Sequence, residues 1–374
     1  MATQTTQTTF RLDESIPSTM RAVVYRGVND LRLETVPVPT IGPGELLVKI
    51  AVCGICGTDL KKIHTGSHSA PRIFGHEMAG LVAQSNNPRF AVGDRVMVYH
   101  HVPCGHCYYC RKDTPAQCER YKKVGTTAGF EPSGGGFAEY IRVMDWIANE
   151  GGVVPIPSGV PFEQASFVEP VNTVLKGVKM LNLAADETVL VLGQGPIGLM
   201  HATLAARTGA RVFTSDLYAE RHALAARFGL RNPIYADREN VVERLRAATE
   251  GRGADAVILA VGGNSLIRTA MDAARPGGKV MLFAQTQHGE AVVDPAAVCM
   301  DEKALVGSYS SSFTIADEVK NLVFGGYRNG FDLTRLISHR FPLEAAAAAI
   351  ELASHPQPDS MKITLEPLAG AGAQ

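Results

Sequence analysis

Short apolar runs separated by turn residues fill the first 150 positions of the chain. They include MRAVVY (20–25), ELLVKIAV (45–52), DRVMVY (94–99) and FAEYIRV (137–143). Runs of this length that are rich in β-branched and aromatic residues, bounded by Gly and Pro, are typical of strands. This part of the sequence predicts an all-β or barrel-like domain that carries long loops.

The pattern changes after about residue 170, where apolar strands alternate with segments of helical periodicity. The predicted strands are 187–193, 210–216, 255–261, 279–284 and 303–309, and the predicted helices are 196–209, 219–229, 240–251 and 265–278. This alternation favours a parallel, doubly wound sheet. The remaining sequence predicts a helix at 343–355 and a last strand at 361–368.

Composition limits the classes of protein that fit this pattern. The chain has 374 residues, of which 45% are hydrophobic and 20% charged, and its net charge is −1. These values are ordinary for a globular protein of two domains, and they do not indicate a surface for nucleic acid. The first twenty residues lack the apolar core of a signal peptide, and no apolar window is long and unbroken enough for a membrane anchor. We therefore expect a cytoplasmic protein that binds neither nucleic acid nor membrane.

The segment VLVLGQGPIGLM (189–200) contains the pattern G-x-G-x-x-G between a predicted strand and a predicted helix. In that context the pattern is typical of a dinucleotide site. Gly193 would allow the tight turn, Gly195 the approach of a diphosphate, and Gly198 close contact of helix and strand. Pro196 suits the first turn of a helix, whose N-terminus would bind the diphosphate.

The next predicted strand ends at Asp216, 23 residues after Gly193. A carboxylate at that position can accept hydrogen bonds from the adenosine ribose and repels a 2′-phosphate, which favours NAD over NADP. Arg221 follows one helical turn later, where it either weakens this preference or is a surface residue.

Seven cysteines are present, and four of them form the pattern C-x2-C-x2-C-x7-C at Cys104, Cys107, Cys110 and Cys118. In a chain without a secretory signal, clustered cysteines are more often metal ligands than disulfides. Four thiolates can enclose one Zn²⁺ and leave no open position, so we expect a structural zinc site. An iron–sulfur cluster and a disulfide-bonded loop are the alternatives.

A second group of potential ligands is dispersed along the sequence. Cys56 lies in VCGICGTDL, His76 and Glu77 in FGHEMAG, and Glu169 in SFVEPVNTV. A catalytic zinc takes about three protein ligands of these types and an exchangeable water or substrate. Spacing alone leaves structural roles for these residues equally open.

Together these segments resemble the zinc-dependent medium-chain dehydrogenases, particularly the sorbitol (polyol) and threonine dehydrogenase branch. The resemblance extends from Met20 onward and includes GGGFAEYIRV (134–143). It implies an α/β protein with a GroES-like β-barrel catalytic domain (20–168 and 309–374), an inserted Rossmann domain (169–308) and a flexible tail (1–19).

The resemblance also implies roles for single residues. Cys56 and His76 correspond to ligands of the catalytic zinc, and Glu77 and Glu169 to two acids of which either one binds the metal or holds its water. Glu169 occupies a position where classical alcohol dehydrogenases have cysteine, which favours the polyol branch. Asp59 corresponds to the acid that orients the zinc-bound histidine.

Other positions correspond to the substrate and cofactor contacts of the family. Thr58 matches the hydroxyl that contacts the substrate oxygen, and Thr173 and Ile197 match residues that line the nicotinamide. Lys61 stands where many relatives have the histidine that ends a proton relay, and a lysine of ordinary pKa is a poor base at neutral pH. It could instead bind the cofactor or an anionic substrate, and His64 could take over the relay, but a solvated helix face is the favoured explanation for both residues.

The implied reaction is hydride transfer between a secondary alcohol, such as a polyol or sugar, and NAD, with one catalytic and one structural zinc per chain. A threonine 3-dehydrogenase, a simple alcohol dehydrogenase and a non-catalytic, zinc-stabilised nucleotide-binding protein are the alternatives. The family further implies a homo-oligomer, a dimer or a homotetramer, paired through a Rossmann sheet edge near residues 279–284.

Overall fold

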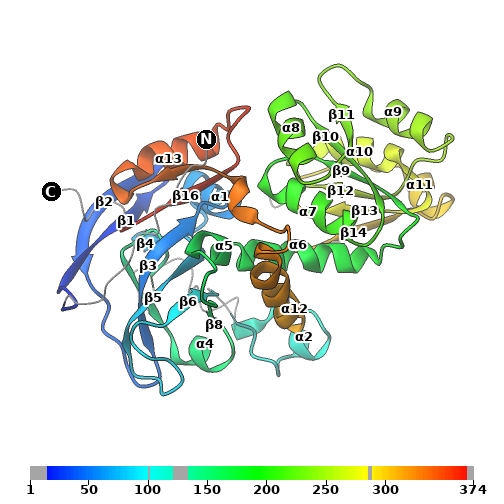
Figure 1. Cartoon of the computed structure of the whole chain (residues 1–374). Helices are drawn as coiled ribbons and strands as arrows, with labels where there is room; N and C mark the ends of the chain where they lie inside the picture. The colour runs from blue at the N-terminus through cyan, green and yellow to red at the C-terminus, as the bar shows by residue number, and fades with distance from the viewer. Residues whose placement is uncertain (1–14, 100–101, 121–133, 285–288, 369–374) are drawn as a thin grey trace.

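The computed structural model describes residues 15–99, 102–120, 134–284 and 289–368. They form two lobes that are joined through helix α6 (Val168–Leu181). In Figure 1 the blue and the orange-red ends of the chain lie together in one lobe, and the segments coloured from bright green to yellow form the other. The first lobe is therefore built from both ends of the chain.

The first lobe contains two sheets. Strands β1 (Thr19–Gly27), β2 (Asp30–Pro37) and β4 (Arg72–Ile73) form one in the order β2-β1-β4. The other follows the order β15-β16-β3-β5-β6-β8, with β7 also paired to β3. Its strands are β3 (Leu46–Gly54), β5 (Glu77–Ser85), β6 (Arg95–Val98), β7 (Tyr140–Val143), β8 (Val153–Pro155), β15 (Ile337–Phe341) and β16 (Lys362–Leu365).

Short helices connect these strands. They are α1 (Gly57–Thr65), α2 (Tyr108–Arg111), η1 (Pro115–Gln117), α4 (Asp145–Asn149), α5 (Phe162–Ser166), η4 (Leu333–Leu336), η5 (Leu343–Ala345) and α13 (Ala346–Ser354). Helix α1 packs beside α13, so a helix from the start of the chain and one from its end cover the same part of the lobe (Figure 1).

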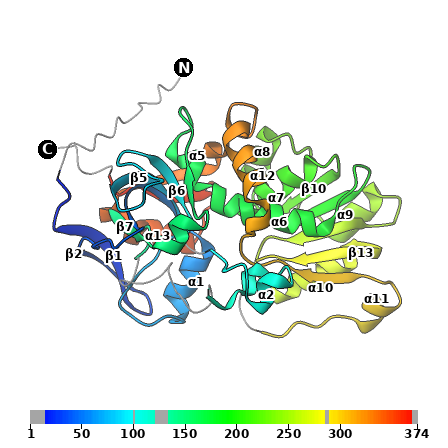
Figure 2. The same cartoon turned by 90° about the horizontal axis from the view of Figure 1, so that it is seen from below.

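The second lobe is a parallel sheet in the order β11-β10-β9-β12-β13-β14, with helices around it (Figure 2). The strands are β9 (Thr188–Leu192), β10 (Arg211–Asp216), β11 (Asn232–Tyr235), β12 (Ala254–Leu259), β13 (Ala274–Leu282) and β14 (Ala304–Gly307). The helices are α7 (Pro196–Ala206), α8 (Ala219–Arg227), α9 (Val241–Ala248), α10 (Asn264–Ala273) and α11 (Pro295–Cys299). The doubly wound parallel sheet that the sequence predicts is confirmed.

Side chains of the central strand β9 alternate between two cores. Val189 and Val191 belong to one hydrophobic cluster, and Leu190 and Leu192 belong to another on the opposite face. The first of these clusters also includes Tyr99 of the first lobe. Because one core crosses between the lobes, α6 is packed against both of them.

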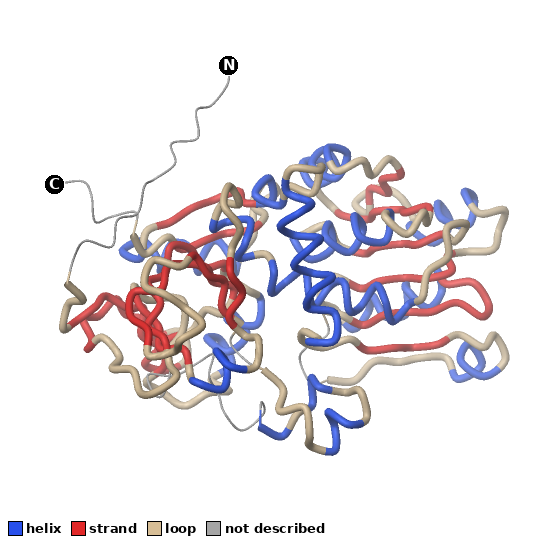
Figure 3. The backbone as a smooth tube through the Cα atoms, turned by 60° about the horizontal axis from the view of Figure 1, so that its bottom comes forward, coloured by secondary structure: helices blue, strands red, loops and turns tan. Residues whose placement is uncertain are grey.

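The chain returns to the first lobe through η2 (Phe313–Ile315), α12 (Ala316–Lys320) and the π-helical turn η3 (Asn321–Gly325). Asn172 of α6 fixes this return, since its amide donates to the hydroxyl of Tyr99 and to the carbonyl of Ser312. Figure 3 shows these helices running between the two groups of strands.

Two details differ from the predictions. Helix α10 ends at Ala273, because β13 already begins at Ala274 and includes the Pro-Gly-Gly segment that we assigned to the helix. The predicted pairing edge at 279–284 is wrong, because β13 lies between β12 and β14 and the edges of the sheet are β14 and β11.

The predicted tail, 1–19, lies outside the described residues up to position 14, and β1 begins at Thr19. Within the described part of the chain, every helix is too short or too polar to cross a bilayer.

Candidate active site and metal centres

Cys56 lies at the N-cap of α1, directly after strand β3. Its Sγ accepts a hydrogen bond from the backbone N–H of Thr58, and its own N–H donates to Asp59 Oδ2 at 3.1 Å. The other carboxylate oxygen of Asp59 lies 3.0 Å from His76 Nδ1. The start of the helix thereby fixes a thiol, a carboxylate and an imidazole relative to one another.

Asp59 is completely buried. Burial alone would raise the pKa of its carboxyl, but the charge and hydrogen bond of His76, together with the charge of Lys62, hold this pKa below its usual value. An ionised Asp59 accepts the proton of His76 Nδ1, which leaves Nε2 as the ring atom that can bind a metal.

The ligand atoms of Cys56, His76 and Glu77 all lie within 4.8 Å of one another. Glu77 is buried at the start of β5, and its Oε1 has no hydrogen-bond partner among the described residues. Glu169 is also buried, but it lies outside this group of three. Burial raises the pKa of Glu169 to about 7. The charge of His76 opposes this rise, and the charge of Glu77 adds to it. A thiol, an imidazole and an orphaned carboxylate oxygen in a buried position fit a zinc ion.

Lys362 of β16 extends into the same site and was not predicted from the sequence. Its Nζ forms an ion pair with Glu77 Oε2 and donates to the carbonyl of Ile55 at 2.9 Å. Burial alone would lower the pKa of Lys362, but the charges of Glu77 and Cys56 raise it above its usual value. A Cβ on Gly54 would come within 2.6 Å of the lysine Cε, so the glycine leaves the space for this pair. The available signal was one lysine in the apolar strand MKITLEPL.

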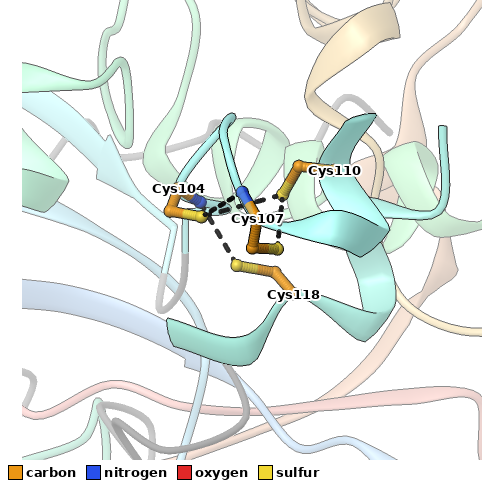
Figure 4. A group of neighbouring side chains, drawn as sticks. All are labelled: Cys104, Cys107, Cys110 and Cys118. Carbon is orange, nitrogen blue, oxygen red and sulfur yellow. Dashed lines mark hydrogen bonds between the residues drawn. The ribbon is translucent and has the colours of Figure 1, made fainter. Parts of the chain in front are cut away.

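The four cysteines of the 104–118 loop converge from α2 and the turns around it (Figure 4). Sγ of Cys110 lies 3.5 Å from that of Cys107 and 4.0 Å from that of Cys104. A tetrahedral zinc with bonds of about 2.3 Å separates its sulfur ligands by about 3.8 Å, whereas a disulfide brings them to about 2.05 Å. None of the four cysteines forms a disulfide, and the spacing of their sulfur atoms fits a metal rather than a disulfide. Cys53, by contrast, belongs to neither group of potential ligands. It is fully buried, and burial, followed by the charges of Asp59 and Glu77, raises the pKa of its thiol well above the usual value.

The glycine-rich turn joins β9 to α7 in the predicted way. Gly193 has φ +88°, and a Cβ there would lie 2.7 Å from that of Val261. A Cβ on Gly198 would lie 1.8 Å from the carbonyl oxygen of Gly193, so only glycine fits. Around Gly195 a Cβ would meet nothing within 4 Å, and Pro196 begins α7. Space therefore remains above the helix N-terminus for a diphosphate.

Asp216, at the end of β10, is turned toward this loop. Its Oδ2 accepts from the backbone N–H of Gln194 at 2.6 Å and lies 3.3 Å from a guanidinium nitrogen of Arg221. Only 13% of the Arg221 side chain is exposed, so it is part of the site rather than a surface residue.

The remaining predicted residues lie on helices α1, α6 and α7. Thr58 is in the first turn of α1, Thr173 is one turn after Glu169 in α6, and Ile197 is in the first turn of α7. Both ring nitrogens of His64 are engaged elsewhere, with Asn29 Oδ1 at 2.6 Å and Ser354 Oγ at 2.8 Å. This histidine faces α13 and is not placed to replace Lys61 in a relay.

Comparison with known proteins agrees with this arrangement. Residues 42–158 match the family described as alcohol dehydrogenase GroES-like domain, and residues 196–324 match that described as zinc-binding dehydrogenase. The chain is 33% identical over 350 residues to L-threonine 3-dehydrogenase of Symbiobacterium thermophilum, which covers 90% of this chain and 94% of that protein. The chain belongs to the zinc-dependent medium-chain dehydrogenase family. This medium-chain dehydrogenase is also 27% identical over 364 residues to sorbitol dehydrogenase of Bacillus subtilis, covering 95% of this chain and 99% of the other.

Solved structures lead to the same family. A protein of Sinorhizobium meliloti 1021, described as a zinc-binding dehydrogenase bound to NADP, superposes with a TM-score of 0.83 at 29% identity. The match covers 94% of this chain and 100% of that one. The medium-chain dehydrogenase is thus a zinc-dependent alcohol oxidoreductase that uses a nicotinamide nucleotide, with a GroES-like and a Rossmann domain.

Proposed function

We propose that this enzyme oxidises a secondary alcohol of the polyol or sugar type with NAD. The observation that carries the proposal is the buried group of Cys56, His76 and Glu77, with Glu169 beside it at the start of α6. Helix α6 continues from there into the dinucleotide-binding lobe. A hydride can pass only between atoms in contact, so a metal site at the junction of the two lobes suits an alcohol held against a nicotinamide.

Cys56 and His76 would hold a catalytic zinc, with Glu77 or Glu169 as the third protein ligand. Bound there, zinc would supply positive charge that favours loss of the alcohol proton. Asp59 keeps His76 in one orientation and tautomer. Thr58 accepts the proton from the alcohol and passes it onward, while Thr173 and Ile197 form the wall against which the nicotinamide rests.

A second zinc would be held by Cys104, Cys107, Cys110 and Cys118. Because four thiolates fill a tetrahedral shell, this ion would stabilise its loop and take no part in the reaction.

Asp216 supports NAD as the preferred nucleotide, since its carboxylate lies where a 2′-phosphate would add a second negative charge. Arg221 offsets part of that charge, and a relative of known structure binds NADP. We therefore expect a preference for NAD that is graded rather than absolute.

The edge strand β14 supports a homo-oligomer, either a dimer or a tetramer. Leu305 on this strand is exposed, as are Val298 and Met300 next to it. An unpaired strand with apolar neighbours is a surface that a second copy covers by continuing the sheet.

A threonine 3-dehydrogenase and a simple alcohol dehydrogenase share this site chemistry, and a non-catalytic nucleotide-binding protein would share only the fold. One experiment separates them: purified enzyme is assayed for metal content and for reduction of NAD and NADP with polyols, sugars, L-threonine and simple alcohols. Two zinc ions per chain and turnover of a polyol or sugar are expected. Fast turnover of L-threonine or of simple alcohols alone would contradict the substrate class, and one zinc without turnover would contradict the catalytic proposal.

A further inference from the structure

Helix α1 presents two lysines on the same face as Thr58. Asp59 and Ile63 are buried to one side of this face, about 100° and 140° around the helix from Thr58. At 100° per residue, Lys61 and Lys62 lie within about 60° of Thr58 and one turn, about 5.4 Å, beyond it. Both lysines are partly buried rather than extended into solvent. Two cationic side chains therefore flank the hydroxyl that we place against the reacting alcohol.

The loop after α1 adds further basic groups to the same place. Phe74, which precedes His76 by two residues, has the ring of His68 edge-on at 6.2 Å and Nζ of Lys62 at 5.8 Å from its centroid. Arg72 is held at the base of this loop by hydrogen bonds to Ser69. The loop thus folds back and brings His68 and Arg72 to the side of α1 that carries Lys62.

The electrostatic effect of this arrangement is visible at His68. Burial, followed by the charges of Lys62 and Arg72, lowers the pKa of this histidine to about 4. At neutral pH His68 is therefore an uncharged hydrogen-bonding group between two cations. The buried acid nearest to them, Asp59, is already bonded to His76.

We propose that the alcohol this enzyme oxidises is anionic, with a carboxylate or a phosphate ester a few bonds from the reacting hydroxyl, and that Lys62 with Lys61 binds that group. The inference rests on the proposed dehydrogenase function and narrows its substrate class. A lysine in place of a proton-relay base is then explained by substrate binding, because a fixed cation pairs with an anion that hydroxyl-only polyols lack.

The first test compares substrates that differ in charge but not in carbon skeleton. Initial rates of NAD reduction by the zinc-loaded enzyme are measured with a set of stereoisomeric hexitols, the corresponding hexonates and the hexitol monophosphates. At low ionic strength we expect at least one anionic series to have a kcat/KM about tenfold or more above that of the neutral hexitols. This preference should decline as salt is raised to about 0.5 M, because the lysines are only partly buried and their charges are therefore screened. The two anionic series distinguish a carboxylate from a phosphate as the recognised group.

The second test removes one charge. Lys62→Met keeps the aliphatic contact with Phe74 and should lower kcat/KM for the anionic substrate about fivefold to tenfold, with the values for neutral hexitols and the KM for NAD unchanged. Lys49→Met is the matched control. Lys49 is on strand β3, and its Nζ lies 5.9 Å from the centroid of the Tyr140 ring. This variant should change neither kcat/KM for the anionic or neutral substrates nor the KM for NAD.

The outcomes separate the two proposals. Turnover of neutral hexitols that equals or exceeds that of both anionic series would overturn the inference and leave the dehydrogenase function intact, as would an equal loss for neutral and anionic substrates in Lys62→Met. No turnover of any alcohol with either nucleotide would overturn both.

Discussion

Removal of the charge on Lys362 tests how the active site is held together. The ammonium group lies between Glu77 and the carbonyl of Ile55, and the side chains of the pair are 8% and 1% exposed. Lys362→Met keeps the length and apolar stem of the side chain and leaves Glu77 without its partner. The variant therefore isolates the ion pair from the packing around Gly54.

The expected loss follows from burial. Breaking a buried ion pair by removing one partner costs about 3–5 kcal/mol, because the remaining charge is left uncompensated. The proposed zinc ion would offset part of the charge on Glu77, so we expect a loss at the lower end, about 3 kcal/mol. With a urea dependence of about 2–3 kcal/mol per molar, the midpoint of unfolding should fall by about 1–1.5 M.

The chain offers a built-in probe for this measurement. Its one tryptophan, Trp146, lies in α4 of the catalytic lobe, so its fluorescence follows the lobe that contains the ion pair. Urea unfolding of the zinc-loaded enzyme is compared with that of Lys362→Met. Lys49→Met in the same lobe serves as a control for loss of a lysine that is not paired with an acid at the site.

A double-mutant cycle with Glu77→Gln completes the test. Each single variant leaves one unpaired buried charge, whereas the double variant leaves no buried charge at this position, so it should be more stable than the sum of the single losses predicts. A loss below about 1 kcal/mol for Lys362→Met, or strict additivity, would refute the view that the pair stabilises the site.

Three other substitutions test the metal sites and the cofactor, and a fourth tests pH dependence. Cys56→Ala should abolish NAD reduction and lower the zinc content from two per chain to one; retained turnover would contradict its role as a ligand. Asp216→Ala should raise the KM for NAD about tenfold or more and reduce the preference over NADP, and unchanged cofactor kinetics would argue against its contact with the ribose. Cys107→Ser should lower the thermal midpoint and remove the other zinc, and normal melting would contradict a stabilising metal there. His201 is fully buried, and burial lowers its pKa to about 3; the unfolded chain therefore takes up a proton below pH 6.5 that the folded protein does not, and stability is lost as pH falls from 6.5 toward 3. At pH 5 that loss is about 2 kcal/mol, so His201→Phe should show a flatter stability profile between pH 7 and pH 5, and parallel profiles would contradict this assignment.

Much of the dinucleotide-binding lobe could be predicted because its signals are local. Both faces of β9 are buried, so the strand is apolar from Val189 to Leu192, and the glycines that follow are needed for contacts within the same turn. The four-cysteine loop was equally accessible, since its thiols lie within 15 residues of one another.

The errors and omissions arise from contacts between distant segments. β14 is short and largely exposed, so the sequence did not reveal that it adds an edge beyond β13. Lys362 meets Glu77 only because β16 runs antiparallel to β3, with Thr364 opposite Gly54. The pattern of apolar and polar residues within each of these two strands does not indicate that the strands pair.

The origin of Lys362 in the last strand has a consequence for how the enzyme is made. Cys56, His76 and Glu77 leave the ribosome early. Lys362, which neutralises Glu77, follows 285 residues later in the chain. At about 5–20 residues per second, that interval is on the order of tens of seconds. During that time the inserted nucleotide-binding lobe can fold, while the nascent metal site has its acids without their counter-ion and β3 lacks its neighbour β16. Truncation of the last thirteen residues, from Lys362 onward, would therefore remove a charge from the reaction centre and not merely shorten a tail.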